Sequence, residues 1–93
     1  MLSGSKLSEL NVVRITVAYF ARAREYTGTG EEELELSEPA SLQQLLSRVM
    51  VIHPSLTDIK QLLSPLVNGK WVPNDTTLKD GDRIALLPPV GGG

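Results

Sequence analysis

The first patterned stretch of the chain alternates apolar and polar residues with the period of a β-strand. It runs from Val12 to Phe20, and such an alternation is typical of a strand with one buried face. The positions predicted to face the core are Val13, Ile15, Val17 and Tyr19. Phe20 falls on the opposite face, with Arg14 and Thr16, where an aromatic ring meets water unless a partner or a loop covers it.

A second alternating stretch, from Glu31 to Ser37, places glutamates opposite leucines. It predicts a strand with a solvated acidic face. Residues 21–30 form a basic segment that closes on Gly28 and Gly30, and we expect a turn region there. Parallel strands need a crossover connection longer than this one, so the two strands are predicted to pair antiparallel.

After Pro39 the apolar period changes to that of a helix. Ser41 is predicted to cap the helix, and Gln44 completes a capping box. The apolar stripe consists of Leu42, Leu45, Leu46, Val49 and Met50. We expect the helix to end near His53, because Pro54 disfavours helical geometry in the residue before it. The His53 side chain is then placed to bond the last carbonyls, and a lone histidine is a poor metal site.

Shorter signals follow the helix. Residues 55–64 predict one or two helical turns that cross back over the core. Asn68-Gly69 favours a type I′ hairpin turn between two short strands, Leu66-Val67 and Lys70 to Val72, because these two residue types accept positive φ angles.

A last strand is predicted from Arg83 to Leu87, with Ile84 and Leu86 on its core face. The order of elements predicts an α+β domain: a small mixed sheet with one main helix packed across it. The β-grasp arrangement satisfies this order. In that arrangement the first and last strands lie parallel at the centre of the sheet, so the C-terminal tail leaves from its middle.

Length, charge and composition narrow the class of protein. The 93 residues suffice for one domain, which buries roughly 60–65% of its unfolded surface. We divide the chain into a flexible extension, residues 1–11, and one domain, residues 12–93. The net charge of -2 leaves no basic footprint for nucleic acid. Without a signal peptide or a spanning stretch, we expect a cytoplasmic protein that binds no membrane.

The chain contains no cysteine. This excludes disulfides, thiolate metal sites and a cysteine nucleophile within the chain. We expect no metal site and no cofactor bound by this chain. Any sulfur chemistry would have to use sulfur brought from elsewhere.

The C-terminal tail is the most unusual stretch of the sequence. Pro88 and Pro89 fix φ and cannot donate to a sheet ladder, so they end the last strand and project the tail outward. Gly91, Gly92 and Gly93 let the backbone enter a narrow channel. A glycine-rich terminus is commonly frayed, but this one follows a stiff base that would direct it into a partner.

Three large apolar residues are predicted to lie outside the core: Phe20, Trp71 and Leu87. Exposed apolar clusters usually mark contact sites, and we interpret these three as a partner interface on the outer face of the sheet. The alternative is that Trp71 packs on its own hairpin and Phe20 under a loop. Arg22 and Arg24 are suited to steering an acidic partner, or they are simply solvated.

Four segments in this order resemble the MoaD family, the small subunit of molybdopterin synthase. They are Val17 to Glu25, Val67-Asn68-Gly69, Leu78 to Asp82, and Ala85 to Val90 followed by the glycine end. The resemblance covers nearly everything from Val12 to Gly93. It departs from the family in the longer extension and in a third glycine at position 91.

The resemblance implies a ubiquitin-like sulfur carrier. Gly93 would be adenylated by an E1-like enzyme that uses ATP and magnesium, and then converted to a thiocarboxylate. The carrier would dock its tail into the large synthase subunit, which holds the catalytic pocket, and pass sulfur to the cyclic pyranopterin precursor of the molybdenum cofactor. Two small and two large subunits usually form that complex, so this chain would itself be a sulfur-donor subunit rather than the catalytic one.

Other functions remain open on the residues alone. The same fold suits a sulfur carrier for thiamine or tRNA thiolation, or a ubiquitin-like modifier that is joined to lysines through Gly93. A β-grasp binding module whose tail has no chemistry is a third possibility.

Overall fold

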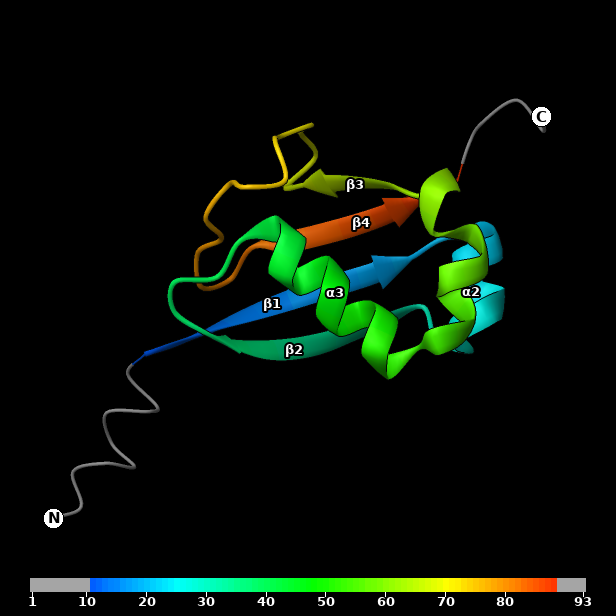
Figure 1. Cartoon of the computed structure of the whole chain (residues 1–93), viewed down its shortest axis with the longest axis horizontal. Helices are drawn as coiled ribbons and strands as arrows, with labels where there is room; N and C mark the ends of the chain where they lie inside the picture. The colour runs from blue at the N-terminus through cyan, green and yellow to red at the C-terminus, as the bar shows by residue number, and fades with distance from the viewer. Residues whose placement is uncertain (1–10, 89–93) are drawn as a thin grey trace, which may run out of the picture.

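The structure is a computed structural model that describes residues 11–88. A mixed four-stranded sheet has the strand order β2-β1-β4-β3, and α3 crosses one of its faces (Figure 1). In chain order the elements are β1 (Val12–Tyr19), α2 (Ala21–Thr27), β2 (Glu31–Ser37), α3 (Leu42–Ile52), the 3-10 helix η1 (Pro54–Leu62), β3 (Ser64–Val67) and β4 (Arg83–Leu87). The predicted α+β class and β-grasp arrangement are confirmed.

The strand register places the first and last strands together at the centre of the sheet. β1 pairs antiparallel with β2, from Val12 opposite Ser37 onward. β1 also pairs parallel with β4, with Tyr19 opposite Leu86. β3 pairs antiparallel with the other edge of β4. The predicted antiparallel and parallel pairings are thus both observed.

The helix α3 begins at the predicted capping box. The backbone N–H of Gln44 donates to the Ser41 hydroxyl (3.1 Å), and the N–H of Ser41 donates to the Gln44 side-chain oxygen (2.8 Å). A cap of this kind contributes about 1 kcal/mol. The helix ends at Ile52, and the N–H of His53 donates to the Val49 carbonyl at 2.8 Å. Pro54 then starts η1, as its effect on the preceding residue predicts.

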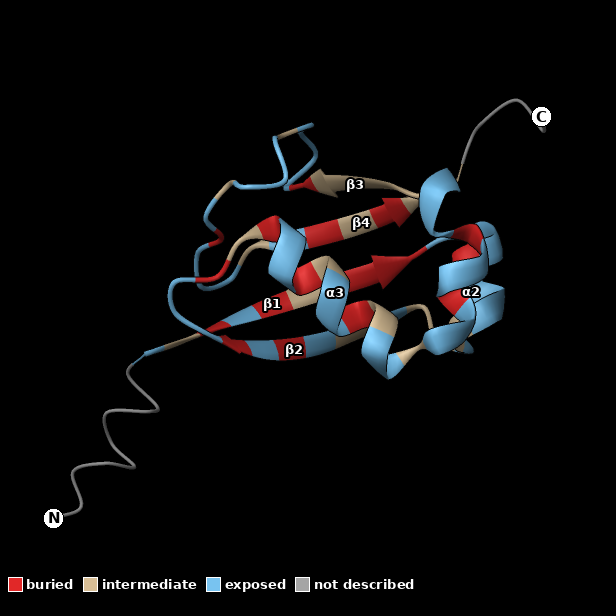
Figure 2. Ribbon diagram, viewed as in Figure 1, coloured by how far each residue is buried: buried red, intermediate tan, exposed pale blue. Residues whose placement is uncertain are grey.

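The core lies between the sheet and α3 (Figure 2). The predicted inward residues of β1 are 0–1% exposed, as are Ile84 and Leu86 of β4. From α3, the first, fourth and eighth residues are fully buried. The buried hydrophobic residues of the helices are Ala23, Leu42, Leu45, Val49, Leu56 and Ile59. Within residues 11–88 no polar or charged residue is buried, so apolar packing holds this domain together.

The segment predicted as a basic turn region is instead the short helix α2. It ends at Gly28, whose φ is +77° and whose N–H donates to the Arg24 carbonyl at 2.8 Å. Alanine, arginine and glutamate are good helix formers, and a glycine in the left-handed region is a common helix end. The sequence pattern missed α2 because one residue, Ala23, is its whole buried face.

The Asn68-Gly69 turn is present, but the second strand of its hairpin is not. Both residues have positive φ (52° and 83°), and Val67 and Lys70 exchange backbone hydrogen bonds of 2.8 and 3.0 Å. Their pairing stays an isolated bridge. Pro73 follows two residues after Trp71 and cannot donate to a ladder, so no strand forms in residues 71–78.

No helix within residues 11–88 is long and apolar enough to cross a membrane.

Candidate functional site: the tail exit and the outer face of the sheet

The C-terminal ends of β1 and β4 meet at one end of the sheet. Tyr19 and Leu86 are register partners in parallel strands, and both side chains are buried. Successive side chains of a strand point to opposite faces, so the next residues, Phe20 and Leu87, lie on the outer face. Pro88 follows as the last described residue. The remaining tail residues, Pro89 and Gly91 to Gly93, lie outside the described part of the chain.

Phe20 is held beside this exit by the turn into α2. Its backbone is extended (φ −120°), and the next residue, Ala21, has φ +50°. An alanine whose φ lies in the left-handed region turns the chain sharply, and this conformation costs backbone strain. The Phe20 side chain stays 43% exposed, while Leu87 is half-buried. An apolar pair therefore flanks the base of the tail.

Trp71 is the most exposed aromatic residue within residues 11–88, at 68%. The register of β3 and β4 pairs Ser64 with Leu87 and Val67 with Ile84. The turn that leads to Trp71 therefore lies at the opposite end of β4 from Leu87, about 10 Å away along the strand. The structure brings Phe20 and Leu87 to one end of the sheet and leaves Trp71 near the other.

Apolar residues occupy the outer side of β3, β4 and β1 between these two ends, and two of them, Leu66 and Ala85, are half-buried. Leu66 pairs with Ala85 across β3 and β4, and Ala85 pairs with Ala18 across β4 and β1. Each of the three alternates with core-facing neighbours, so they point away from α3. Leu66, Ala85 and Leu87 are each half-buried and form an apolar strip along the outer side of β4, whereas Ala18 is only 1% exposed.

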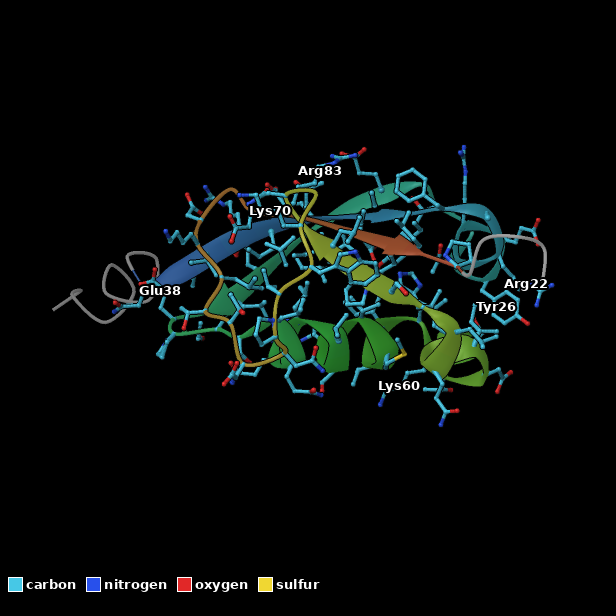
Figure 3. All side chains as sticks on the ribbon, turned by 90° about the horizontal axis from the view of Figure 1, so that it is seen from above. Arg22, Tyr26, Glu38, Lys60, Lys70 and Arg83 are labelled. Atoms are coloured by element: carbon cyan, nitrogen blue, oxygen red, sulfur yellow. The ribbon has the colours of Figure 1, made fainter. Side chains whose placement is uncertain are left out.

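Ion pairs border this strip on its β2 side. Arg83 on β4 donates to Glu31 on β2 at 3.1 Å, and this contact crosses β1 over Ala18. Arg14 donates to Glu35 at 3.2 Å. Figure 3 shows Arg83 on the face of the sheet away from α3. The acidic strand face predicted to be only solvated is thus partly neutralised by arginines, and it gives the outer face a charged half and an apolar half.

Arg22 and Arg24 both lie exposed on α2. In Figure 3, Arg22 and Tyr26 extend from this helix away from the sheet. The Arg24 guanidinium packs over Gly30, with its carbon 3.4 Å from where a Cβ would stand. Neither arginine forms an ion pair with another described residue, so both remain available to an acidic partner.

Sequence reasoning missed a polar cluster beneath the tail exit. One carboxylate oxygen of Glu32 accepts hydrogen bonds from the Tyr19 hydroxyl and from His53 Nε2, the latter at 2.7 Å. The Tyr19 and His53 rings meet edge to face, with centroids 5.4 Å apart. Burial, and then the neighbouring Glu32 carboxylate, raise the pKa of Tyr19 well above its usual value.

The His53 side chain therefore does not bond the last carbonyls of α3, as predicted from its position. Its backbone N–H fills that role with the Val49 carbonyl, which leaves the ring free to reach β2. A signal for the cluster exists in the sequence, because Glu32 shares the core-facing register with Leu34 and Leu36. An acidic residue at such a position requires a partner.

A family comparison decides where this chain belongs. The model of the ThiS family matches residues 17–93, a stretch that includes the end of β1, the other three strands, α3 and the glycine tail. The chain belongs to the ThiS family.

Relatives of this ThiS-family chain include sulfur carriers. It is 37% identical over 83 residues to the molybdopterin synthase sulfur carrier subunit of Chlamydomonas reinhardtii, with 87% of this chain and 100% of the algal protein covered. The resemblance to the MoaD family is thereby confirmed.

Solved structures agree in fold. A putative molybdopterin converting factor subunit 1 from Pyrococcus furiosus superposes with a TM-score of 0.78 at 36% identity, covering 84% of this chain and 99% of that one. A chain in the complex of subunits 1 and 2 of the molybdopterin-converting factor from Helicobacter pylori superposes with a TM-score of 0.62 at 28% identity, covering 87% and 100%.

Side chains that could hold a metal ion were sought among residues 11–88 of this ThiS-family chain. Within residues 11–88 no three His, Asp or Glu side chains gather in a way that could hold a metal ion. Two grooves, of about 380 and 170 Å³, flank α3 on the side away from the outer face. The features around the tail exit are suited to presenting a chain end to another protein.

Proposed function

We propose that this chain is the sulfur carrier subunit of a molybdopterin synthase and that the carboxyl group of Gly93 is its reactive group. The observation that carries the proposal is the parallel pairing of β1 with β4, which sets Phe20 and Leu87 beside the strand end that continues into Pro88 and the glycine tail. The names of relatives covering most of the chain support it.

The chemistry follows from the weak reactivity of a carboxylate. At neutral pH the terminal carboxyl group is ionised, since its pKa is near 3.5, and it is a poor electrophile. An E1-like enzyme would let a carboxylate oxygen of Gly93 attack the α-phosphorus of ATP, so that pyrophosphate leaves. A sulfur nucleophile then attacks the carbonyl carbon and AMP departs, which divides one difficult substitution into two easier steps. The ATP and magnesium belong to the activating enzyme.

The resulting thiocarboxylate would be the sulfur donor in the synthase. A large subunit would bind the outer face through Phe20, Leu87 and Trp71 and receive the tail in its catalytic pocket, where the cyclic pyranopterin precursor accepts the sulfur. Large exposed aromatic residues are the usual anchors of such contacts. A related chain occurs in a two-subunit converting-factor complex. We expect two small and two large subunits per complex, in the cytoplasm.

The domain's part in this reaction is to hold and direct the C-terminal tail. The central strand β4 is paired on both sides, so the tail starts from the most constrained part of the sheet. Pro88 and Pro89 stiffen the base, and Gly91 and Gly92 give the reacting carbon access to a narrow site. Arg22 and Arg24 would steer an acidic partner toward this end.

The test is the intact mass of the protein purified from its own cells under non-reducing, mild conditions. A carrier shows a fraction in which one oxygen is replaced by sulfur, and the mass difference maps to the C-terminal peptide. Co-purification of a large synthase subunit then assigns the pathway. A free carboxylate alone, in cells that make the cofactor, contradicts the proposal. Recovery of Gly93 linked to lysines would assign a protein modifier instead, and a thiamine or tRNA enzyme as partner would assign another thiolation pathway.

A further inference from the structure

The end of η1 lies beside the base of the C-terminal tail, on the side opposite to Phe20. β3 begins at Ser64, which pairs with Leu87 at the end of β4. Leu62, the last residue of η1, stands two residues earlier, and Figure 1 shows this end of η1 beside the end of β4. β1 and β3 flank β4 at about 4.8 Å each. The tail base therefore lies between Phe20 and the junction of η1 with β3.

Leu62 is exposed at this junction, although the next residue is packed. Leu63 has an extended backbone (φ −90°, ψ 139°) and packs against the core, whereas Leu62 is 49% exposed, a larger fraction than the 43% of Phe20. A single exposed leucine is ordinary. This one, however, stands with Phe20 on the two sides of Leu87 and Pro88, which are both half-buried. The tail base is thus bordered by an apolar side chain on each side.

We propose that Leu62 is a contact for the large synthase subunit, which thereby holds the tail base from both sides of β4. The inference rests on the proposed function, because it requires a partner that encloses the tail. A channel around an extended chain has walls about 5 Å from the backbone on each side. On the β1 side such a wall meets Phe20, and on the β3 side it meets Leu62.

The surface at this junction is continuous with the outer face of the sheet. Ser64 and Leu87 are directly opposite each other in antiparallel strands, so their side chains share one face. Leu87 belongs to the apolar strip that continues through Ala85 and Leu66. A subunit that binds this strip can therefore extend past Ser64 to Leu62 within one interface. This continuity favours the large subunit over a separate protein as the partner of Leu62.

Calorimetric titration of the full chain with the large subunit tests the contact. In Leu62→Ser the affinity should fall roughly five- to tenfold, because about half of a leucine side chain is free to be buried by the partner. Leu62→Met keeps an apolar side chain of similar volume and should retain most of the affinity. Val51→Ser is the matched control, since Val51 is 74% exposed in the groove between α3 and β2, and it should bind as the wild type does.

Three results would overturn the inference. If Leu62→Ser binds as tightly as the wild type, or no more weakly than Val51→Ser, Leu62 is no contact, and the proposed function is unaffected. If the wild-type chain itself does not bind the large subunit, the proposed function fails and the inference fails with it. Normal binding of Leu62→Ser with slower adenylation of Gly93 would place Leu62 in the interface with the activating enzyme instead. Thermal melts accompany each titration, and Leu62→Gln, which keeps the aliphatic stem, replaces Leu62→Ser if that variant does not fold.

Discussion

The hydroxyl of Tyr19 donates a hydrogen bond to the carboxylate of Glu32, which joins the end of the central strand β1 to the start of β2. His53 completes the contact from the end of α3. Because Tyr19 also pairs with Leu86 of β4, this cluster holds the end of the sheet from which the tail departs.

The first prediction concerns alkaline pH. The raised pKa of Tyr19 in the folded protein means that the unfolded chain loses the tyrosine proton first, near pH 10. The contribution of Tyr19 to the free energy of unfolding is therefore complete below about pH 10. It falls as the pH rises further, with a limiting slope near 1.4 kcal/mol per pH unit. Urea unfolding from pH 8 to 11 should show this loss, and Tyr19→Phe should reduce it. Tyr26→Phe, at an exposed tyrosine, is the control and should leave the pH dependence intact.

The second prediction concerns Glu32. Glu32→Ala leaves the Tyr19 hydroxyl and the His53 ring without their shared acceptor, and we expect a loss of about 1–3 kcal/mol in the free energy of unfolding. Glu33→Ala is the matched control, because Glu33 is exposed on the adjacent position of the same strand and surface changes usually stay within about 0.5 kcal/mol. Equal losses from both variants in urea titrations would show that the cluster contributes nothing.

The third prediction concerns the turn between β1 and α2. Ala21 has φ +50°, where an L-residue pays roughly 1–2 kcal/mol that glycine avoids. Ala21→Gly should therefore raise the free energy of unfolding by roughly 0.5 kcal/mol, after the entropy of the unfolded glycine is subtracted. The reverse change at Gly81, whose φ is +91° with no atom near its missing Cβ, should destabilise. A thermal melt in which Ala21→Gly is the less stable protein contradicts the strain argument.

The fourth prediction concerns the outer face. Phe20→Asp and Trp71→Ala should weaken binding of the large synthase subunit at least tenfold, because each removes an exposed aromatic anchor, and thermal stability should change little. Val51→Asp introduces a charge at an exposed apolar residue on the α3 side and should leave this affinity unchanged. Calorimetric titration measures all three, and equal affinities would place the interface elsewhere.

The fifth prediction concerns the tail. Deleting Gly93 should abolish sulfur transfer without unfolding the domain, since the core is formed by residues of the sheet and helices. Gly92→Ala should slow transfer, because it adds a Cβ where the partner's channel is expected to be narrow. Single-turnover transfer from the thiocarboxylate form, compared with the thermal melt of each variant, separates the two effects. Full activity of Gly92→Ala would contradict the narrow channel.

Several elements follow from local pattern alone. The inward set of β1, the capping box at Ser41 and the end of α3 at His53 each depend on residues within one or two turns, whose geometry is set by side-chain period, cap chemistry and a following proline. The turn at Asn68-Gly69 is equally local. The order of such elements, together with the family resemblance, was sufficient to predict the β-grasp sheet.

What the sequence by itself determined is therefore the set of elements, the inward faces of the strands and the composition of the tail. Only the tertiary structure decided that 21–27 is helical, that Trp71 has no strand to support it, and that Glu32 meets both Tyr19 and His53. The physical reason is the separation along the sequence over which each kind of interaction acts. Periodicity and capping act between near neighbours in the chain, whereas the Glu32 contacts join segments that lie far apart in sequence and α2 leaves no periodic signal. The missing strand at Trp71 has a local cause, Pro73, whose effect on pairing shows only once the strands are placed.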